Sequence, residues 1–195
     1  MNTGFSTNKP VSSRPSSPKT KLKEKKMRDR KVLFITQAAM IAALYVVLTL
    51  LANALGLANY AVQIRFSEAL TILPFFTPAA IPGLWVGCVL ANFLTGCAPL
   101  DILFGSLATL IGAVGTYALG RYKWAAPLPP ILANTVIVPF VLAYVYQFPG
   151  SIPYFMLTVG AGEIISCGIL GMILLTVLNK YKNVIFKKEN IMFTK

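Results

Sequence analysis

Uncharged apolar stretches, separated by short polar or proline-rich breaks, dominate the middle of the chain. Such stretches are typical of transmembrane helices, which need about 20 apolar residues to cross roughly 30 Å of hydrocarbon. Prolines mark several of the breaks, because proline lacks the N–H that a helix interior requires. The segments that we predict as helices are 32–58, 66–77, 79–95, 100–120, 126–147 and 154–181. The pattern therefore predicts an all-α integral membrane bundle of about six transmembrane helices.

Basic residues gather at the two ends of the chain, and this distribution decides the number of spans. Of the 18 Lys and Arg residues, ten lie in residues 1–31 and five in residues 180–195. Cytoplasmic segments beside membrane helices are enriched in basic residues. If residues 66–95 cross twice, 17 of the 18 basic residues are cytoplasmic and only Arg65 is outside, whereas a single crossing moves seven of them outside. We therefore expect six spans, the second short or bent, with both termini in the cytoplasm.

The two ends of the chain differ from its middle in composition. The first 31 residues are polar, basic and interrupted by prolines, which predicts a disordered cytoplasmic tail. The six-helix transmembrane domain is expected at 32–182, followed by a second basic cytoplasmic tail at 183–195. The basic run before the first span has no interleaved aromatic residues, so we interpret it as an orientation signal beside anionic lipid and not as a nucleic-acid site.

The chain contains no histidine, which removes the commonest metal ligand and general base. The three cysteines have no C-x-x-C spacing, and we expect them to be small buried fillers. We therefore predict neither a catalytic residue nor a metal site, and no cofactor bound by this chain.

Three carboxylates interrupt the apolar region, and the six-span topology places all of them in its outer half. Glu68 lies at the outer mouth of the second span and Asp101 begins the fourth. Glu163 lies about 13 Å below the outer end of the sixth span at 1.5 Å per residue. A carboxylate within a span costs at least ~2.5 kcal/mol, so we expect Glu163 to face a cavity or a partner.

The other polar residues also have structural explanations that the sequence leaves open. Arg65 fits an anchor at the membrane interface, while Glu68 and Asp101 suit helix N-termini. Asn92 and Asn134 fit hydrogen bonds between helices.

Small residues recur at four-residue spacing near the inner ends of two spans, a pattern that lets another helix approach closely. The first span carries two such pairs, and the third carries one. These pairs are Ala38 with Ala42, Ala39 with Ala43, and Gly83 with Gly87. Ordinary packing within the bundle explains them equally well.

Three runs of sequence resemble a known family. The run 62–74 (VQIRFSEALTILP), its continuation 75–84 (FFTPAAIPGL) and the run 101–110 (DILFGSLATL) are similar to the signature of the QueT-type queuosine-precursor transporters. The likeness covers about residues 32–182 and leaves both tails out.

The resemblance implies a substrate-binding S component of an energy-coupling factor (ECF) transporter, a multi-pass protein of the bacterial plasma membrane. Residues 32–182 would bind a vitamin-like molecule from outside, and a transmembrane coupling protein with two ATPase subunits would drive its release inside. The chain has no G-x-x-x-x-G-K-[ST] loop. We therefore expect the partners to use the ATP, and we do not expect this chain to be an enzyme. In such proteins an Ala-x-x-x-Ala face of the first helix contacts the coupling protein, a role implied for Ala38 and Ala42, with Ala39 and Ala43.

The ligand implied by the resemblance is a 7-deazaguanine, whose ring N–H and exocyclic amine suit a carboxylate acceptor. Glu163 is our candidate for that acceptor. Candidate donors to the ring carbonyl are Arg65, Gln63, Asn92 and Asn134. Glu68 or Asp101 would balance the cation of an aminomethyl form.

Two other function classes remain open at this point. A stand-alone proton-coupled secondary transporter of a small vitamin-like molecule would use Glu68, Asp101 or Glu163 as a proton relay, but the spans show no convincing inverted repeat. An intramembrane enzyme would lack histidine and have a single membrane aspartate.

Overall fold

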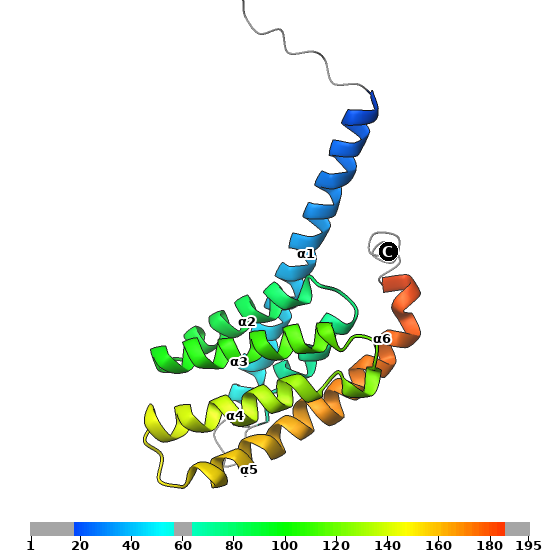
Figure 1. Ribbon diagram of the computed structural model, residues 1–195. Coiled ribbons are helices and arrows are strands. Elements are labelled where there is room, and N and C mark those ends of the chain that lie inside the picture. The colour runs from blue at the N-terminus through cyan, green and yellow to red at the C-terminus, as the bar shows by residue number, and fades with distance from the viewer. Residues whose placement is uncertain (1–17, 57–63, 186–195) are drawn as a thin grey trace, which may run out of the picture. The chain divides into compact units, whose positions relative to one another are not determined.

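The computed structural model describes residues 18–56 and 64–185 of the 195-residue chain, and they form helices connected by short turns, with no strand within those two ranges (Figure 1). The all-α prediction is therefore confirmed. The elements are α1 (Pro18–Ala54), the 3₁₀ helix η1 (Phe66–Phe75), α2 (Ala80–Leu94), α3 (Pro99–Ala118), the short 3₁₀ turn η2 (Lys123–Ala125), α4 (Leu128–Tyr144), α5 (Ile152–Glu163), the π-helical segment η3 (Ile164–Leu170) and α6 (Gly171–Ile185).

The chain divides into two compact units, residues 1–33 and 34–195. In the first unit, α1 already begins at Pro18, within the tail that we predicted to be disordered. Residues 19–31 are mostly Lys, Arg, Glu, Leu and Met, which are good helix formers, and proline is favoured in a first helical turn. The prediction of disorder is therefore wrong for residues 18–31, while the remainder of the tail lies outside the described residues.

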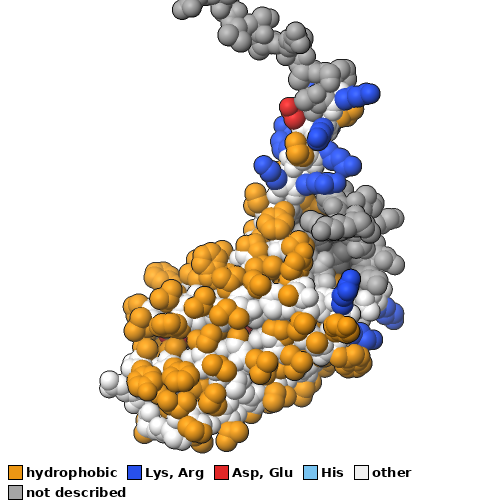
Figure 2. All heavy atoms as spheres, viewed as in Figure 1, with side chains coloured by type: hydrophobic (Ala, Val, Ile, Leu, Met, Phe, Trp, Pro, Cys, Tyr) orange, Lys and Arg blue, Asp and Glu red, His pale blue; other side chains and the backbone are white. Residues whose placement is uncertain are grey.

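The helices have the length and surface of a membrane protein. Four are long and apolar enough to span a bilayer, namely Lys21–Ala54, Pro99–Ala118, Lys123–Tyr144 and Ile152–Tyr181, and two shorter apolar helices are η1 and α2. Large apolar side chains cover the visible face of the helices (Figure 2). Leu157, Phe93 and Leu132 are among those that point outward. The expected apolar helices are all present, and the second is short, as predicted.

Within the second unit, the part of α1 from Phe34 onward runs parallel to α2 and touches it through small residues. A Cβ added to Gly83 would lie 2.7 Å from the Ala38 carbonyl oxygen, and one added to Gly87 would lie 3.0 Å from the Ala42 Cα. The contacts move toward the C-terminal end of both helices together, so α1 and α2 point in the same direction. The chain must therefore cross back between the end of α1 and the start of α2, and η1 lies on that return path. The second predicted span therefore runs back along the bundle, which supports an even number of crossings.

Glycine also sets the contact between α3 and α4, which run antiparallel. A Cβ on Gly112 would lie 2.7 Å from the Pro130 Cα, and one on Gly115 would lie 2.5 Å from the Pro129 Cβ. The prolines occupy the first turn of α4, where their missing N–H costs no helical hydrogen bond. They fill the notch that the two glycines leave in α3. The helices α2, α3, α4 and α5 then pack in chain order, each against the next (Figure 1).

The sixth predicted span is one continuous helical run in which α5 passes through η3 into α6. Its π-helical part packs on η1. The amide of Arg65 donates to the Ser166 hydroxyl at 3.2 Å, and the Thr71 hydroxyl lies 3.3 Å from the Cys167 sulfur. The 3₁₀ helix η1 and the π-helical segment η3 thus meet in the interior of the bundle.

Candidate functional site

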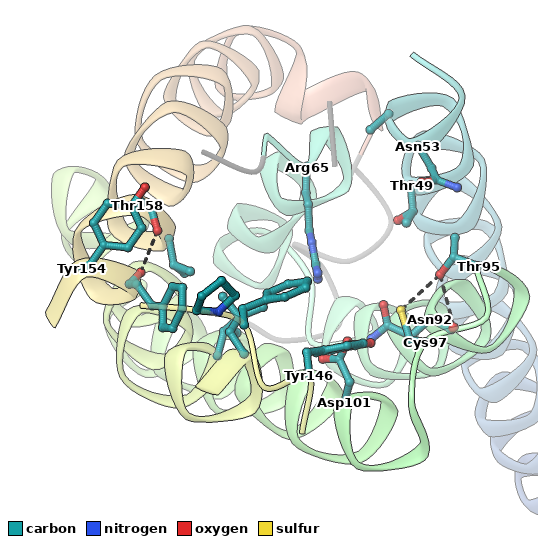
Figure 3. A pocket seen from close by; sticks show the side chains of 17 residues that line it. Thr49, Asn53, Arg65, Asn92, Thr95, Cys97, Asp101, Tyr146, Tyr154 and Thr158 are labelled. Carbon is teal, nitrogen blue, oxygen red and sulfur yellow. Dashed lines mark hydrogen bonds between the residues drawn. The ribbon is translucent and has the colours of Figure 1, made fainter. Parts of the chain in front are cut away.

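A cavity of about 490 Å³ opens at the end of the bundle where α2 ends and α3 begins. Ligand pockets commonly measure roughly 300–1,000 Å³, so this volume suits a small molecule. Its walls come from α1, the start of η1, the α2–α3 turn, α4, the α4–α5 turn and α5. The lining residues are Thr49, Ala52, Asn53, Arg65, Asn92, Thr95, Cys97, Asp101, Val138, Leu142, Tyr146, Phe148, Pro149, Tyr154, Phe155, Thr158 and Val159 (Figure 3).

Arg65 and Asp101 give the cavity its two charges. The Arg65 side chain extends into the space, with Asp101, Asn92 and Tyr146 at its far side (Figure 3). Arg65 and Asp101 act on one another electrostatically. Among the described residues, no carboxylate oxygen forms an ion pair with the Arg65 guanidinium. The guanidinium is therefore available to an acceptor inside the cavity.

Tyr146 holds Asp101 in place. Its hydroxyl donates to the Asp101 Oδ2 at 2.8 Å and accepts from the Ala98 amide at 3.1 Å. Burial of the phenol raises the pKa of Tyr146, and the hydrogen bond to Asp101 adds to that effect, although the Ala98 amide opposes it. The phenol therefore stays protonated at physiological pH and continues to donate. This bridge ties the α4–α5 turn to the start of α3.

A second polar layer lies one helical turn below the cavity wall. Four residues along the helix from a lining residue means about 6 Å of depth at 1.5 Å per residue. Each of four residues in the deeper layer lies four positions along its helix from a residue of the wall. The wall residues are Thr49, Asn92, Val138 and Val159, and the corresponding deeper residues are Tyr45, Cys88, Asn134 and Glu163. All four residues of that deeper layer are buried. We call this layer, together with Glu68 of η1, the cavity floor.

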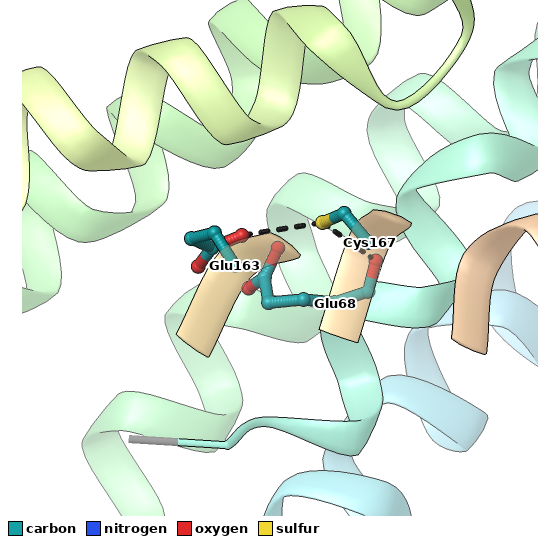
Figure 4. Close-up of side chains that lie close together, drawn as sticks. All are labelled: Glu68, Glu163 and Cys167. Atoms are coloured by element: carbon teal, nitrogen blue, oxygen red, sulfur yellow. Dashed lines mark hydrogen bonds between the residues drawn. The ribbon is translucent and has the colours of Figure 1, made fainter. Parts of the chain in front are cut away.

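Glu68, Glu163 and Cys167 come together in the floor (Figure 4). The Cys167 thiol donates to the Glu163 Oε2 at 3.2 Å and to the Glu68 backbone oxygen at 3.3 Å. Tyr45 donates to the Glu68 Oε1. Glu68 is 1% exposed and Glu163 8% exposed. Two carboxyl groups so placed repel one another when both are ionised, which favours a shared proton or a bound cation.

Polar atoms in the floor lack partners. The Glu68 Oε2 and the Asn134 Nδ2 have no hydrogen-bond partner in the described part of the chain, although Asn134 faces both Glu68 and Glu163. An unpaired buried polar group typically costs about 1–3 kcal/mol. An acceptor and a donor that are both unsatisfied suit a ligand edge that offers a donor and an acceptor in return.

The same floor could hold a small metal ion. One ligand atom each from Glu68, Glu163 and Cys167 lies within 4.8 Å of the others, and all three residues are buried. We did not predict this group from the sequence, because the residues are distant along the chain and include no histidine. Its thiol is already engaged with both glutamates.

Most of the predicted site residues meet around the cavity, but in two layers. Arg65, Asn92 and Asp101 line the wall. Glu68, Glu163 and Asn134 lie in the floor and are not part of the wall. Gln63 lies outside the described residues.

The alanines of α1 divide between two environments. Ala38 and Ala42 pack against the α2 glycines, so the predicted face for a coupling protein is occupied here by the chain's own helix. Ala39 and Ala43 are exposed. The physical reason is that Gly83 and Gly87 lack a Cβ, which allows α2 to approach the Ala38–Ala42 face closely.

Three functional candidates escaped the sequence analysis. Tyr45 and Tyr146 lie within predicted apolar spans and were not singled out, and Cys167 was expected to be a small buried filler. Each one donates a hydrogen bond to a carboxyl group. For Tyr45, the available signal in the sequence was that it is the only phenol in the uncharged predicted span 32–58.

Comparison with known proteins gives two matches. The sequence model of the QueT transporter family matches residues 35–180. A relative named "Queuosine precursor transporter QueT", from Lactococcus lactis subsp. cremoris (strain MG1363), is 33% identical over 98 residues, an alignment that covers 50% of this chain and 57% of the relative. No solved structure matches. The family match includes at least part of each of the six apolar helices and all the residues that line the cavity, and the chain therefore belongs to the QueT transporter family.

Proposed function

We propose that this chain is the substrate-binding membrane subunit of an importer for a queuosine precursor of the 7-deazaguanine type, and that it works in the bacterial plasma membrane as a multi-pass protein. The relative from Lactococcus lactis is named a queuosine precursor transporter. The observation that carries the proposal is a ligand-sized cavity with unpaired polar atoms beneath it. A transported molecule with several hydrogen-bond donors and acceptors needs polar partners of this kind when it leaves water.

The floor and the wall supply complementary groups for a deazaguanine ring. The ring N–H and the exocyclic amine are two donors that Glu163 or the free Glu68 Oε2 can accept. The ring carbonyl is an acceptor for the Asn134 amide or the Arg65 guanidinium. A ligand held in this way satisfies the orphaned floor atoms, which explains why they are buried without partners.

The energy source forms the second part of the proposal. We propose that a transmembrane coupling protein and two ATPase subunits drive release of the ligand on the cytoplasmic side, as the family resemblance implies. The exposed Ala39 and Ala43 pair on α1 is the small-residue face that remains for such a contact. The inward-packed Ala38 and Ala42 are assigned instead to the α1–α2 contact.

Uptake measurements separate this mechanism from proton-coupled transport. Cells that cannot make queuosine precursors would express the chain with and without the coupling protein and the ATPases, and accumulation of labelled 7-aminomethyl-7-deazaguanine would be measured. We expect uptake that requires the partners and persists when the proton gradient is collapsed while ATP is maintained. Uptake by the chain alone that stops with the proton gradient would contradict the ATP-driven mechanism.

A further inference from the structure

The exposed basic side chains described in the second unit lie at the end of the bundle opposite the cavity. The helices α3 and α4 run antiparallel, and α4 packs on α5 across a short turn, so α3 and the run from α5 to α6 point in the same direction. Their C-terminal ends therefore lie at the same end, and both α3 and α6 pack on η1. Figure 2 shows the basic side chains of this unit gathered there. They are Arg121 and Lys123, which follow α3, and Lys180 of α6, and all three are exposed.

No acidic side chain described in the second unit offsets these three charges. Its acids are Glu68, Asp101 and Glu163, which line the cavity or lie in its floor. The end of the bundle that carries the three cations therefore presents charge of one sign only, which attracts anions.

The length of α3 places two of these cations at the depth of the lipid headgroups. Its 20 residues, Pro99–Ala118, measure about 30 Å at 1.5 Å per residue, which equals the thickness of the hydrocarbon core. Arg121 and Lys123 follow directly and so lie just beyond the hydrocarbon. The span Ile152–Tyr181 measures about 45 Å and reaches through the headgroup region as well.

Aromatic rings accompany the cations. The Lys123 Nζ lies 5.3 Å from the centroid of the Trp124 ring, and the Lys180 Nζ lies 5.9 Å from that of Tyr181. Tyr122 is 68% exposed and Trp124 is 74% exposed. Exposed Trp and Tyr rings beside basic residues are typical of the membrane interface, where the ring contacts lipid and its polar atom stays wet.

Hydrogen bonds fix the turn that carries the first two cations. The Thr116 hydroxyl, which is buried, donates to the Ala126 carbonyl oxygen at 2.8 Å. The Tyr122 amide donates to the Leu119 carbonyl oxygen at 2.9 Å. A turn held in this way loses little backbone freedom when an anion binds to it.

We propose that Arg121, Lys123 and Lys180 bind the phosphate of an anionic phospholipid in the cytoplasmic leaflet, with Trp124 packed at the headgroup boundary. Basic clusters at the cytoplasmic ends of transmembrane helices recognise such headgroups, and each cation contributes a gain in affinity of roughly fivefold. This second site lies at the other end of the bundle from the cavity and does not depend on the ligand that the cavity takes.

Tryptophan fluorescence tests the proposal, because the chain has two tryptophans and Trp85→Phe leaves Trp124 as a local probe. The full chain is reconstituted in vesicles of phosphatidylcholine and phosphatidylglycerol, with quenching bromine atoms on the acyl chains of one lipid or the other. For equal amounts of brominated lipid, phosphatidylglycerol should quench Trp124 at least about twofold more strongly. High salt should weaken this preference, since it screens exposed charges.

Removal of the cations identifies the residues responsible. Arg121→Gln, Lys123→Gln and Lys180→Gln together should make the two brominated lipids quench equally. The matched control removes three exposed cations from the N-terminal helix and should keep the preference; its changes are Lys19→Gln, Lys21→Gln and Lys23→Gln.

Two results would overturn the proposal. Equal quenching by the two lipids in the chain that retains all its cations would show that this end has no preference for anionic lipid, and would leave the cations to an acidic protein surface. A preference that survives the loss of the three cations would show that they do not form the site.

Discussion

Glu68 is the residue on which the polar contacts of the bundle converge. Tyr45 donates to one carboxyl oxygen, and the backbone oxygen of Glu68 accepts from Thr71 at 2.6 Å and from Cys167 at 3.3 Å. The second carboxyl oxygen has no partner among the described residues. Three elements, α1, η1 and η3, thus fix the position of one carboxylate and leave one of its oxygens free.

Replacing Tyr45 by phenylalanine tests this arrangement. Tyr45→Phe keeps the ring, which is 1% exposed, but removes the donor to Glu68 and leaves both carboxyl oxygens unpaired. We expect a loss of about 1–3 kcal/mol in the free energy of unfolding, the usual cost of an unsatisfied buried polar group. Thermal unfolding in detergent measures it as a lower midpoint.

Tyr117→Phe provides the matched control, since Tyr117 is 51% exposed on α3. Its midpoint should stay at the wild-type value. Equal midpoints for the two variants would show that the Tyr45 hydroxyl contributes nothing to the floor.

Glu163→Gln tests ligand recognition at the floor. The amide keeps the size of the side chain but cannot ionise, and it replaces one acceptor oxygen by a donor. Hydrogen bonds to charged groups contribute about 1.5–3 kcal/mol, so affinity for 7-aminomethyl-7-deazaguanine should fall roughly tenfold to hundredfold. Equilibrium dialysis with the purified chain measures it, with exposed Glu24→Gln as the control. Unchanged affinity in Glu163→Gln would remove Glu163 from the site.

At the scale of elements, the site is built where helices depart from α geometry. The 3₁₀ helix η1 carries Glu68, and the π-helical segment η3 follows Glu163 directly and carries Cys167. π-Helical turns are rare and often occur at functional sites. Here the two unusual segments pack on each other, so the carboxylates they carry become neighbours.

The close approach of α1 and α2 supports this arrangement, because Tyr45 reaches Glu68 from α1. A Cβ on Gly87 would lie 2.8 Å from the Tyr45 Cβ and 3.0 Å from the Ala42 backbone oxygen. Gly87→Ala should therefore separate the helices and destabilise the chain by about 1–3 kcal/mol, the range for overpacking a close contact.

The matched control is Gly168→Ala, where the nearest atoms would be side-chain methyl groups at 3.7 and 3.9 Å. Thermal midpoints of the two alanine variants should differ clearly, with Gly87→Ala the lower. If Gly87→Ala proved as stable as Gly168→Ala, the α1–α2 contact would be looser than described.

The sequence predicted the apolar helices and the gathering of polar residues at one end, because hydrophobicity and charge are properties of local sequence. It did not predict which neighbour a small-residue face meets. Ala38 and Ala42 have the same pattern whether they pack on α2 or on a second protein. The π-helical turn and the pairing of Tyr45 with Glu68 also depend on tertiary contacts between distant segments, so spacing alone does not encode them.

At the scale of the whole molecule, the membrane domain has two chemically different ends. The cavity lies where α2 ends and α3 begins, while exposed Arg121 and Lys123 lie between α3 and α4 at the other end of α3. Basic residues prefer the cytoplasmic side. The cavity is therefore expected to open to the outside, where an importer must capture its ligand.

Native cysteines allow a test of this orientation. Cys97 lines the cavity, whereas Cys88 and Cys167 are buried. A membrane-impermeant maleimide added to intact cells should label Cys97, and saturating ligand should slow that labelling. In a Cys97→Ser background, Lys123→Cys should react only after the membrane is permeabilised. Labelling of Lys123→Cys in intact cells would reverse the orientation.

The central claim is that this chain alone captures a 7-deazaguanine. Its most direct test is to purify the full chain in lipid nanodiscs from cells grown with queuosine precursors, release the bound small molecules, and identify them by mass spectrometry. We predict that 7-aminomethyl-7-deazaguanine is recovered in near-stoichiometric amount from the wild-type chain and is strongly reduced for Glu163→Gln. Recovery of a flavin, a folate or a metal ion without any deazaguanine would contradict the claim.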